Sequence, residues 1–339
     1  MTKAFITGLA GPELTEDERV LLRSQQPAGI ILFQRNLVTR NQIARLVAAC
    51  VEARGTDRLL VLVDQEGGRV QRLRPPLASL LPPAAAFLAH ARGDIALAAD
   101  LAGTAARLTA EDLRPLGFNT DCAPCLDVRA PGAHDIIGNR AFSERVAEVI
   151  AIGGAFAEGL TAGGLLPVMK HVPGHGRALA DSHLELPVVT AARDVLEATD
   201  FAPFRALAPA IPAAMTAHVV FPAIDAAAPA STSVRVTTEV IRGHCGFDGL
   251  LMSDDLGMKA LTGSFAERTR AVLDAGSDLA LHCSGNFGEM RDVAASAPAL
   301  AGDALRRFEV ALGVAKGVPR PFDVEAARAR IAAMVVAGA

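Results

Sequence analysis

The segment KHVPGHGRALADSH, residues 170–183, holds three histidines, an aspartate and a lysine in a short stretch. Two kinds of chemistry would use such a cluster. His171, His175 and His183 would together be ligands for a zinc ion, because neutral imidazole is a common metal ligand. Alternatively, one histidine beside a carboxylate would transfer protons as a general acid and base.

The spacing of these histidines does not favour a metal. His175 and His183 lie eight residues apart across a glycine-containing loop, which matches none of the compact zinc patterns. A dinuclear barrel hydrolase would draw its ligands from other residues, namely Lys170, His171, His218 and Asp254. The first apolar run, AFITGLAG, however, lacks the His-x-His pair that such a centre needs. We expect no metal and no cofactor, and a metal-dependent amidohydrolase remains the alternative.

The end of the segment, ADSH, favours proton transfer. Asp181 lies two residues before His183, and a carboxylate there would fix the tautomer of the imidazole and stabilise its protonated form. Further along, MSDDLGM supplies Asp254 as a matching carboxylate nucleophile. A carboxylate nucleophile with a separate acid/base is the machinery of retaining glycoside hydrolysis.

Eight short apolar runs recur along the chain and would form the strands of the fold. They cover residues 4–9, 29–33, 59–64, 117–124, 166–171, 213–218, 249–254 and 279–283. Segments with helical periodicity lie between them, at residues 39–54, 94–117, 143–164, 193–207 and 264–276. Nearly continuous apolar runs indicate parallel strands covered on both faces. We predict an α/β fold, a (β/α)₈ TIM-type barrel in a single domain of residues 1–339, over the alternative of a doubly wound open sheet.

Charged residues terminate most of these runs. In a (β/α)₈ barrel, active sites lie at the carboxyl ends of the strands. The sequence therefore predicts an active site that draws on Asp64, Asp121, Lys170, His171, His218, Asp254 and Asp255. This convergence is the strongest indication in the sequence that the protein is an enzyme.

Two further motifs are given structural interpretations. CAPC, residues 122–125, matches a Cys-x-x-Cys redox motif, but it follows a strand end and does not open a helix, which favours small core residues. In DQEGGRVQR, Gly67 and Gly68 predict a tight turn. Neither a dinucleotide-binding glycine motif nor a Walker lysine occurs in the chain.

Composition excludes several classes of protein. The 339 residues are 51% hydrophobic and 21% charged with a net charge of −4, and no Lys/Arg run indicates a nucleic-acid partner. The N-terminal segment becomes acidic too soon for a signal peptide, and the long uncharged run at residues 206–224 contains three prolines. Five scattered cysteines fit a reducing compartment. We expect a cytoplasmic monomer that does not bind membranes.

With these motifs identified, the sequence resembles a known family. The motifs are DQEGGRVQRL, IGNRAFS, KHVPGHG followed by DSH, AHVVFPAID and GFDGLLMSDDLGM. Together they resemble the β-N-acetylglucosaminidases (β-hexosaminidases) of glycoside hydrolase family 3, in the short single-domain bacterial branch that recycles cell wall. The resemblance extends over residues 29–283 and implies a small carbohydrate substrate, a muropeptide with a terminal N-acetylglucosamine.

The resemblance also implies residue roles. Asp254 would be the nucleophile of a retaining mechanism, and His183, oriented by Asp181, would be the general acid/base. The N-acetylglucosamine would be bound by Asp64, Arg72, Arg140, Lys170 and His171. His175, His218 and Asp255 receive no chemical step.

Three alternatives stay open at this point. The adjacent aspartates of SDD would also suit substrate-assisted catalysis by the acetamido group, although the separate Asp181–His183 pair favours the covalent route. Phosphate could replace water, because a histidine does not repel an anionic nucleophile. Finally, the barrel could bind sugar without catalysis, in which case replacing Asp254 would change only affinity.

Overall fold

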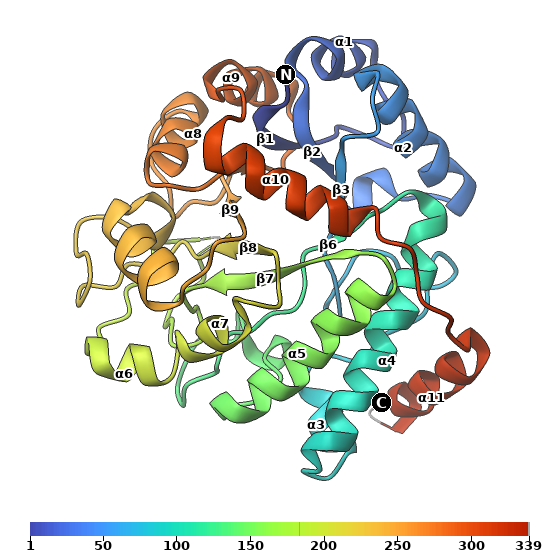
Figure 1. Ribbon diagram of the computed structural model, residues 1–339, viewed down its shortest axis with the longest axis vertical. Helices are drawn as coiled ribbons and strands as arrows, with labels where there is room; N and C mark the ends of the chain where they lie inside the picture. Colours follow the sequence, from blue (N-terminus) through green and yellow to red (C-terminus); the bar gives the residue numbers. More distant parts are fainter. Residues whose placement is uncertain (183, 338–339) are drawn as a thin grey trace.

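The computed structural model describes residues 1–182 and 184–337. Eight parallel strands form a closed barrel in which each strand pairs with its neighbours in the chain, and β10 returns to pair with β1 (Figure 1). The barrel strands are β1 (Lys3–Gly8), β2 (Pro27–Ile31), β3 (Leu60–Val63), β6 (Thr120–Asp121), β7 (Leu166–Val172), β8 (Ala213–Thr216), β9 (Leu250–Asp255) and β10 (Leu279–His282). Each overlaps one of the eight predicted apolar runs, so the prediction of a (β/α)₈ barrel is confirmed.

Helices surround the barrel (Figure 1). They are α1 (Glu16–Gln25), α2 (Arg40–Arg54), α3 (Ala85–His90), α4 (Ile95–Leu113), α5 (Val146–Ala162), α6 (Arg193–Ala198), α7 (Ala202–Leu207), α8 (Phe265–Asp274), α9 (Phe287–Ser296), α10 (Gly302–Ala315) and α11 (Val324–Ala337). A further helical segment spans Val236–His244. The single helix predicted at residues 193–207 is wrong, because two helices occupy it. Pro203 lies in the first turn of α7, where its ring cannot continue a preceding helix.

The two ends of the barrel are built differently. At the end where the strands begin, α10 packs across the opening, and Phe308 and Leu312 join an apolar cluster with Ala4, Ile6 and Ala28. This end is therefore closed by hydrophobic packing. The charged residues of the predicted site all follow the strands at the opposite end.

A small hairpin extends from the end of β3. It consists of β4 (Gln65–Gly67) and β5 (Val70–Gln71), which pair antiparallel. Gly67 and Gly68 have φ of 104° and 57°, and a side chain at either would collide with Pro82 or Pro83. The tight turn predicted for these glycines is confirmed. The hairpin folds back so that the amide of Arg72 donates to the carbonyl of Asp64.

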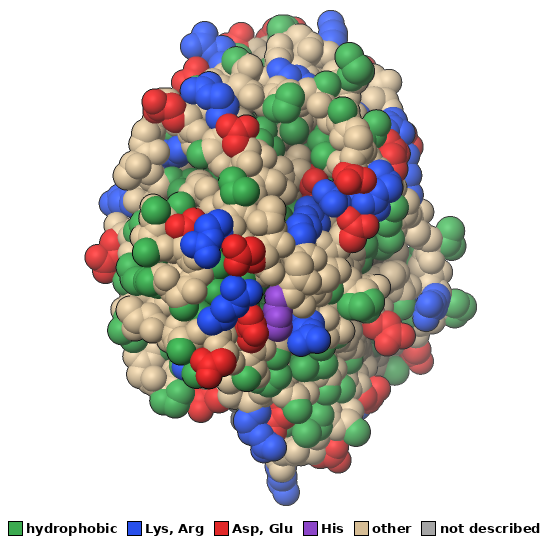
Figure 2. Space-filling view, turned by 60° about the vertical axis from the view of Figure 1, so that its left-hand side comes forward, with side chains coloured by type: hydrophobic (Ala, Val, Ile, Leu, Met, Phe, Trp, Pro, Cys, Tyr) green, Lys and Arg blue, Asp and Glu red, His purple; other side chains and the backbone are tan. Residues whose placement is uncertain are grey.

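The outer surface carries both signs of charge. On the face shown in Figure 2, Lys and Arg side chains are interspersed with Asp and Glu. Within the described residues, no helix is both long enough and apolar enough to span a membrane.

Candidate active site

A cavity of about 440 Å³ lies at the carboxyl ends of the barrel strands. Its walls combine apolar and charged side chains, a mixture suited to a small polar ligand. Six residues singled out from the sequence line it, namely Asp64, Arg72, Arg140, Lys170, His171 and Asp254, together with Asp255. Phe33, Arg69 and Met258 also line the cavity. The structure therefore brings together the five residues predicted to bind sugar and the predicted nucleophile.

Asp64 lies at the end of β3 between two cations. Its Oδ1 is 2.8 Å from the Lys170 ammonium, and its Oδ2 is 2.9 Å from Nη2 of Arg72. Burial alone would raise the pKa of Asp64, but the positive charges of Lys170 and Arg72 outweigh burial and hold the pKa well below its usual range. Asp64 is therefore ionised and acts as a hydrogen-bond acceptor throughout the physiological pH range.

Glu66, in the hairpin strand β4, extends this ion pairing. Its carboxylate makes a bidentate contact with Arg140 at 2.7 and 2.8 Å and lies 2.6 Å from the Lys170 ammonium. Burial favours the neutral acid, but Arg140 and Lys170 lower the pKa of Glu66 to about 2. Two carboxylates, Asp64 and Glu66, in turn hold the pKa of the buried Lys170 above its usual value despite desolvation. Lys170 is thus fixed as a charged donor at the cavity wall.

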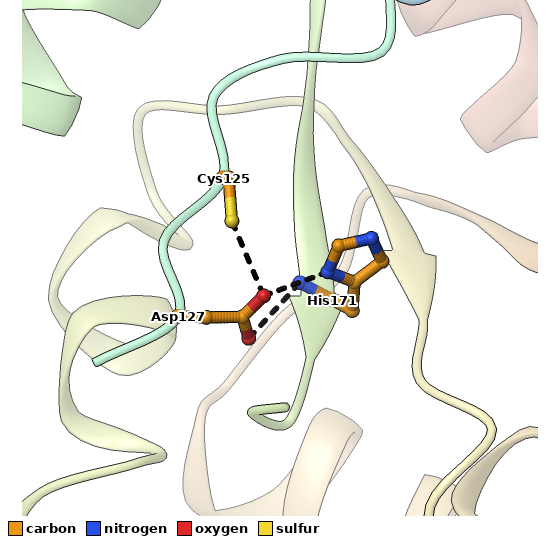
Figure 3. Close-up of side chains that lie close together, drawn as sticks. All are labelled: Cys125, Asp127 and His171. Atoms are coloured by element: carbon orange, nitrogen blue, oxygen red, sulfur yellow. Dashed lines mark hydrogen bonds and ion pairs between the residues drawn. The ribbon is translucent and has the colours of Figure 1, made fainter. Parts of the chain in front are cut away.

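His171 is oriented by a carboxylate behind it (Figure 3). Asp127, which is fully buried in the loop after β6, lies 2.7 Å from Nδ1 of His171. Burial works against ionisation of Asp127, but the neighbouring imidazoles of His171 and His175 keep its pKa well below the usual range. Nδ1 of His171 is therefore the donor in this contact. Its Nε2 lies 3.4 Å from Nη2 of Arg140.

Asp254 lies at the end of β9 and is half-buried. Its Oδ1 accepts the backbone N–H of Asp255 at 2.8 Å, which fixes the rotation of the carboxylate. The side chain of Asp255 turns instead toward the backbone and accepts the N–H groups of Gly257 and Cys283. Burial and the charge of Asp254 raise the pKa of Asp255. Of the two adjacent aspartates, Asp255 is thus anchored to the backbone, which suits a structural role.

Two of the strand-end residues predicted for the mouth do not line the cavity. His218 is fully buried after β8, where its ring contacts the Ser231 hydroxyl and the Asp255 carbonyl. Asp121 is also fully buried, and its Oδ1 accepts the Gln65 N–H at 3.0 Å. Burial raises the pKa of Asp121 to about 8. Both residues support the strand ends from within the barrel, beneath the residues that line the cavity.

The loop after β7 carries the predicted acid/base segment. Its start is fixed by the His175 N–H, which donates to Asp127 Oδ1 at 2.6 Å, and by Arg177, which pairs with Asp200 at 2.6 Å. Asp181 is half-buried, and its carbonyl accepts the N–H groups of residues 184 and 185. His183, the predicted general acid/base, lies outside the described residues.

Two residues of the site were missed by sequence reasoning. Glu66 and Asp127 lie a few residues beyond the ends of the predicted strands. They nevertheless hydrogen-bond to the predicted binding residues Arg140 and His171. A signal existed for Asp127, because it is the only acid in the otherwise small or apolar stretch CAPCLDV, whereas Glu66 lies two residues after Asp64 in DQEGG. Only the fold shows that Arg140, 74 residues away, is the partner of Glu66.

Comparison with known proteins identifies the family of this chain. Residues 4–302 match the glycosyl hydrolase family 3 N-terminal domain. The chain belongs to glycoside hydrolase family 3. A β-hexosaminidase of Alkalilimnicola ehrlichii is 41% identical over 83% of this chain and 80% of its own length. A β-hexosaminidase of Stenotrophomonas maltophilia is likewise 41% identical, over 82% of this chain and 83% of its own.

A solved structure agrees with this assignment. NagZ of Neisseria gonorrhoeae, determined in complex with N-trifluoroacetyl-D-glucosamine, superposes with a TM-score of 0.87 at 32% identity. The match covers 98% of this chain and 97% of that protein. The resemblance inferred from the motifs is thus confirmed, and the protein is a glycoside hydrolase, a β-N-acetylhexosaminidase.

Proposed function

We propose that the enzyme is a retaining exo-β-N-acetylglucosaminidase that removes terminal β-linked N-acetylglucosamine. The observation that carries this proposal is the shared cavity, in which Asp254 faces the same space as the charged group of Asp64, Lys170, Arg140 and His171. A cavity of this size accommodates one sugar ring, so cleavage would occur from the end of a chain.

In the first chemical step, a carboxylate oxygen of Asp254 attacks the anomeric carbon. The bond to the leaving oxygen breaks, and that oxygen takes a proton from His183. In the second step, His183 removes a proton from water, whose oxygen displaces Asp254 and restores the free enzyme. Asp181 would orient His183, because a carboxylate two residues away can hold the imidazole tautomer and stabilise its protonated form.

The charged group of the cavity wall would bind the sugar hydroxyls. Lys170 and Arg72 present donors while Asp64 presents acceptors, and all three are held in place by their mutual ion pairs. Charged hydrogen-bond partners in a desolvated pocket discriminate strongly against a hydroxyl in the wrong position. His171 and Arg140 line the same cavity, and Arg140 is linked to Lys170 through the Glu66 carboxylate.

The natural substrate that we propose is N-acetylglucosamine joined to 1,6-anhydro-N-acetylmuramoyl peptides, so that the enzyme would act in the cytoplasm in peptidoglycan recycling. The support is the 41% identity with curated β-hexosaminidases and the fit to the NagZ structure. Comparing turnover of this disaccharide-peptide with that of chitobiose tests the assignment. A higher kcat/KM for chitobiose would contradict it.

The first experiment is release of nitrophenol from its β-N-acetylglucosaminide, with and without excess EDTA. Release that is unaffected by EDTA supports the proposal. Release abolished by EDTA would favour a metal-dependent hydrolase, and no release would leave a sugar-binding barrel. Product analysis by NMR then distinguishes retention from inversion, and added phosphate reveals whether a sugar phosphate forms.

A further inference from the structure

One thiol of the CAPC motif, that of Cys125, has a charged partner. All five cysteines are free and buried. Cys122 lies among apolar side chains of the barrel interior, as expected of a small core residue. Cys125 also packs against apolar side chains, those of Ile137 and Ala141, but its Sγ lies 3.2 Å from Oδ2 of Asp127 (Figure 3).

The same carboxylate oxygen also accepts from Nδ1 of His171, at 2.7 Å. A thiol, a carboxylate and an imidazole therefore converge on one point, and their ligand atoms all lie within 4.8 Å of one another. Around a tetrahedral cation, bond lengths of about 2.0 Å to N and O and about 2.3 Å to S place ligand atoms about 3.3–3.6 Å apart. Two of the three separations, 3.2 Å from Sγ to Oδ2 and 2.7 Å from Oδ2 to Nδ1, already lie near that spacing, and side-chain rotation would adjust the third.

We propose that Cys125, Asp127 and His171 form a binding site for a single thiophilic divalent cation, and that its occupation inhibits the enzyme. Thiolate and imidazole ligands select soft or borderline cations over magnesium or calcium. The site shares His171 with the sugar cavity, but the proposed mechanism needs no metal. Its effect on turnover rests on the proposed function, whereas its occupation does not.

Charge and protons balance on binding. The cation displaces the Sγ proton of Cys125, which leaves to the solvent, and His171 shifts its ring proton from Nδ1 to Nε2, so that the imidazole stays neutral. A divalent cation with one thiolate and one carboxylate is then neutral overall, which suits a fully buried position.

A fourth ligand is near the cluster. The His175 ring lies 5.8 Å from the His171 ring between centroids, and its backbone N–H already donates to Asp127. Nδ1 of His175 is buried and has no hydrogen-bond partner among the described residues. Burial, together with the neighbouring His171, lowers the pKa of His175 to about 4, which leaves this ring neutral at pH 7. A neutral imidazole is the form that binds metals.

Inhibition follows from the position of His171. It lines the sugar cavity beside Arg140, so a cation bound at Nδ1 would turn the ring away from its bond to Asp127. Asp127 also fixes the loop after β7 through the His175 N–H, so the same cation would shift that loop. The cavity is the entry route, and a sugar bound in it should slow the onset of inhibition.

The test uses cadmium as the probe, with the full-length protein freed of metal by EDTA and dialysis. Thiolate-to-cadmium charge transfer in the ultraviolet reports binding to sulfur, and hydrolysis of the nitrophenyl glycoside reports inhibition. Wild type is compared with Cys125→Ala and Cys125→Val, each relative to its own metal-free rate. Cys245→Ala is the matched control, because it removes a buried thiol whose nearest polar contact is the Phe201 carbonyl.

The proposal expects one equivalent of cadmium–thiolate absorption in wild type and in Cys245→Ala, and none in either Cys125 variant. Loss of a ligand should raise the inhibitory cadmium concentration about tenfold or more. Equal inhibition of wild type and both Cys125 variants would place the cation elsewhere and overturn the proposal. Absence of thiolate absorption in wild type would also overturn it. Circular dichroism confirms that each variant is folded, and Cys125→Val serves if the smaller residue destabilises the loop.

An inactive wild-type enzyme would contradict the proposed function but not the metal site. In that case, the absorption titration still decides whether cadmium binds at Cys125. Conversely, an active enzyme that binds no cadmium retains the proposed function and loses the site.

Discussion

The two walls of the active site are constructed in opposite ways. On the strand side, Asp64, Glu66 and Lys170 lie at or near the ends of strands, Arg140 reaches them from the loop after β6, and each is held by at least one ion pair at 2.6–2.9 Å. On the loop side, residues 173–182 contain neither helix nor strand, and the side chains of Leu179 and Leu184 are 72% and 65% exposed. The strand side is buried and ion-paired, whereas the segment after β7 is held by hydrogen bonds such as those from His134 N–H to the Ala178 carbonyl and between His175 and Ser182.

This difference matches two tasks. Selecting a sugar by its pattern of hydroxyls needs hydrogen-bond donors and acceptors in fixed positions. Misplacing such a group by about 1 Å weakens the discrimination between substrates. Delivering and removing a proton needs a group that can approach the leaving oxygen and then water. Loops carried by a rigid scaffold commonly supply such groups. The comparison predicts that substitutions on the two walls will have distinguishable kinetic effects.

The largest effect is expected from Asp254→Asn, on the strand side. The amide cannot form the glycosyl-enzyme, so kcat should fall on the order of 10⁴-fold or more for every substrate. Affinity for N-acetylglucosamine, measured by calorimetry, should change far less than kcat, because the charged group of Asp64, Lys170 and Arg140 stays intact. An Asn variant that keeps more than a tenth of wild-type activity would refute the covalent mechanism.

His183→Ala should have a kinetic effect that depends on the leaving group of the substrate, unlike substitutions on the strand side. Loss of general acid catalysis costs about 10²–10⁴-fold for a natural sugar leaving group. Activated nitrophenyl glycosides, whose leaving group needs no proton, should keep much more of their rate in the first step. Turnover of both substrate classes is the measurement. Equal losses for both would contradict the assignment of His183 as acid/base.

Glu66→Gln tests how much the buried ion pairs of Glu66 contribute to stability and to sugar binding. Removing the charge leaves buried Arg140 and Lys170 with one carboxylate fewer, and breaking a buried pair in this way costs about 3 kcal/mol of stability. Denaturant unfolding measures the loss, and KM should rise because both cations would shift. Glu309→Gln, at the exposed pair with Arg58, is the control and should change stability by less than about 1 kcal/mol. Equal effects of the two substitutions would mean that burial of the pair is unimportant.

The smallest effect concerns pH and two acids of the strand side. Glu66 has a lowered pKa of about 2, so its contribution to stability is complete above its unfolded pKa and is lost as the pH falls toward 2. Asp121 has a raised pKa of about 8, so stability is lost as the pH rises from the unfolded pKa toward 8. Asp121→Asn should therefore gain stability relative to wild type between pH 5 and pH 8. Melting temperatures of wild type and Asp121→Asn at pH 5 and pH 8 test this. A difference between the two proteins that does not change with pH would contradict it.

The sequence determined the barrel and most of its site. Near-continuous apolar runs predict buried parallel strands because only a sheet covered on both faces hides such runs from water, and each of the eight predicted runs contains a barrel strand. Charged residues at the ends of these runs predicted Asp64, Lys170, His171 and Asp254, since parallel strands direct their carboxyl ends to one side. All four line the same cavity.

Only the tertiary structure decided which charges pair and which point inward. Asp121 and His218 end apolar runs just as Asp64 does, yet their side chains are fully buried away from the cavity. Which of these side chains becomes covered depends on the neighbouring loops, since Asp121 accepts the Gln65 N–H of the hairpin and His218 contacts Ser231. Partners such as Glu66 with Arg140, or Cys125 with Asp127 and His171, depend on distances between separate loops, which no local pattern encodes.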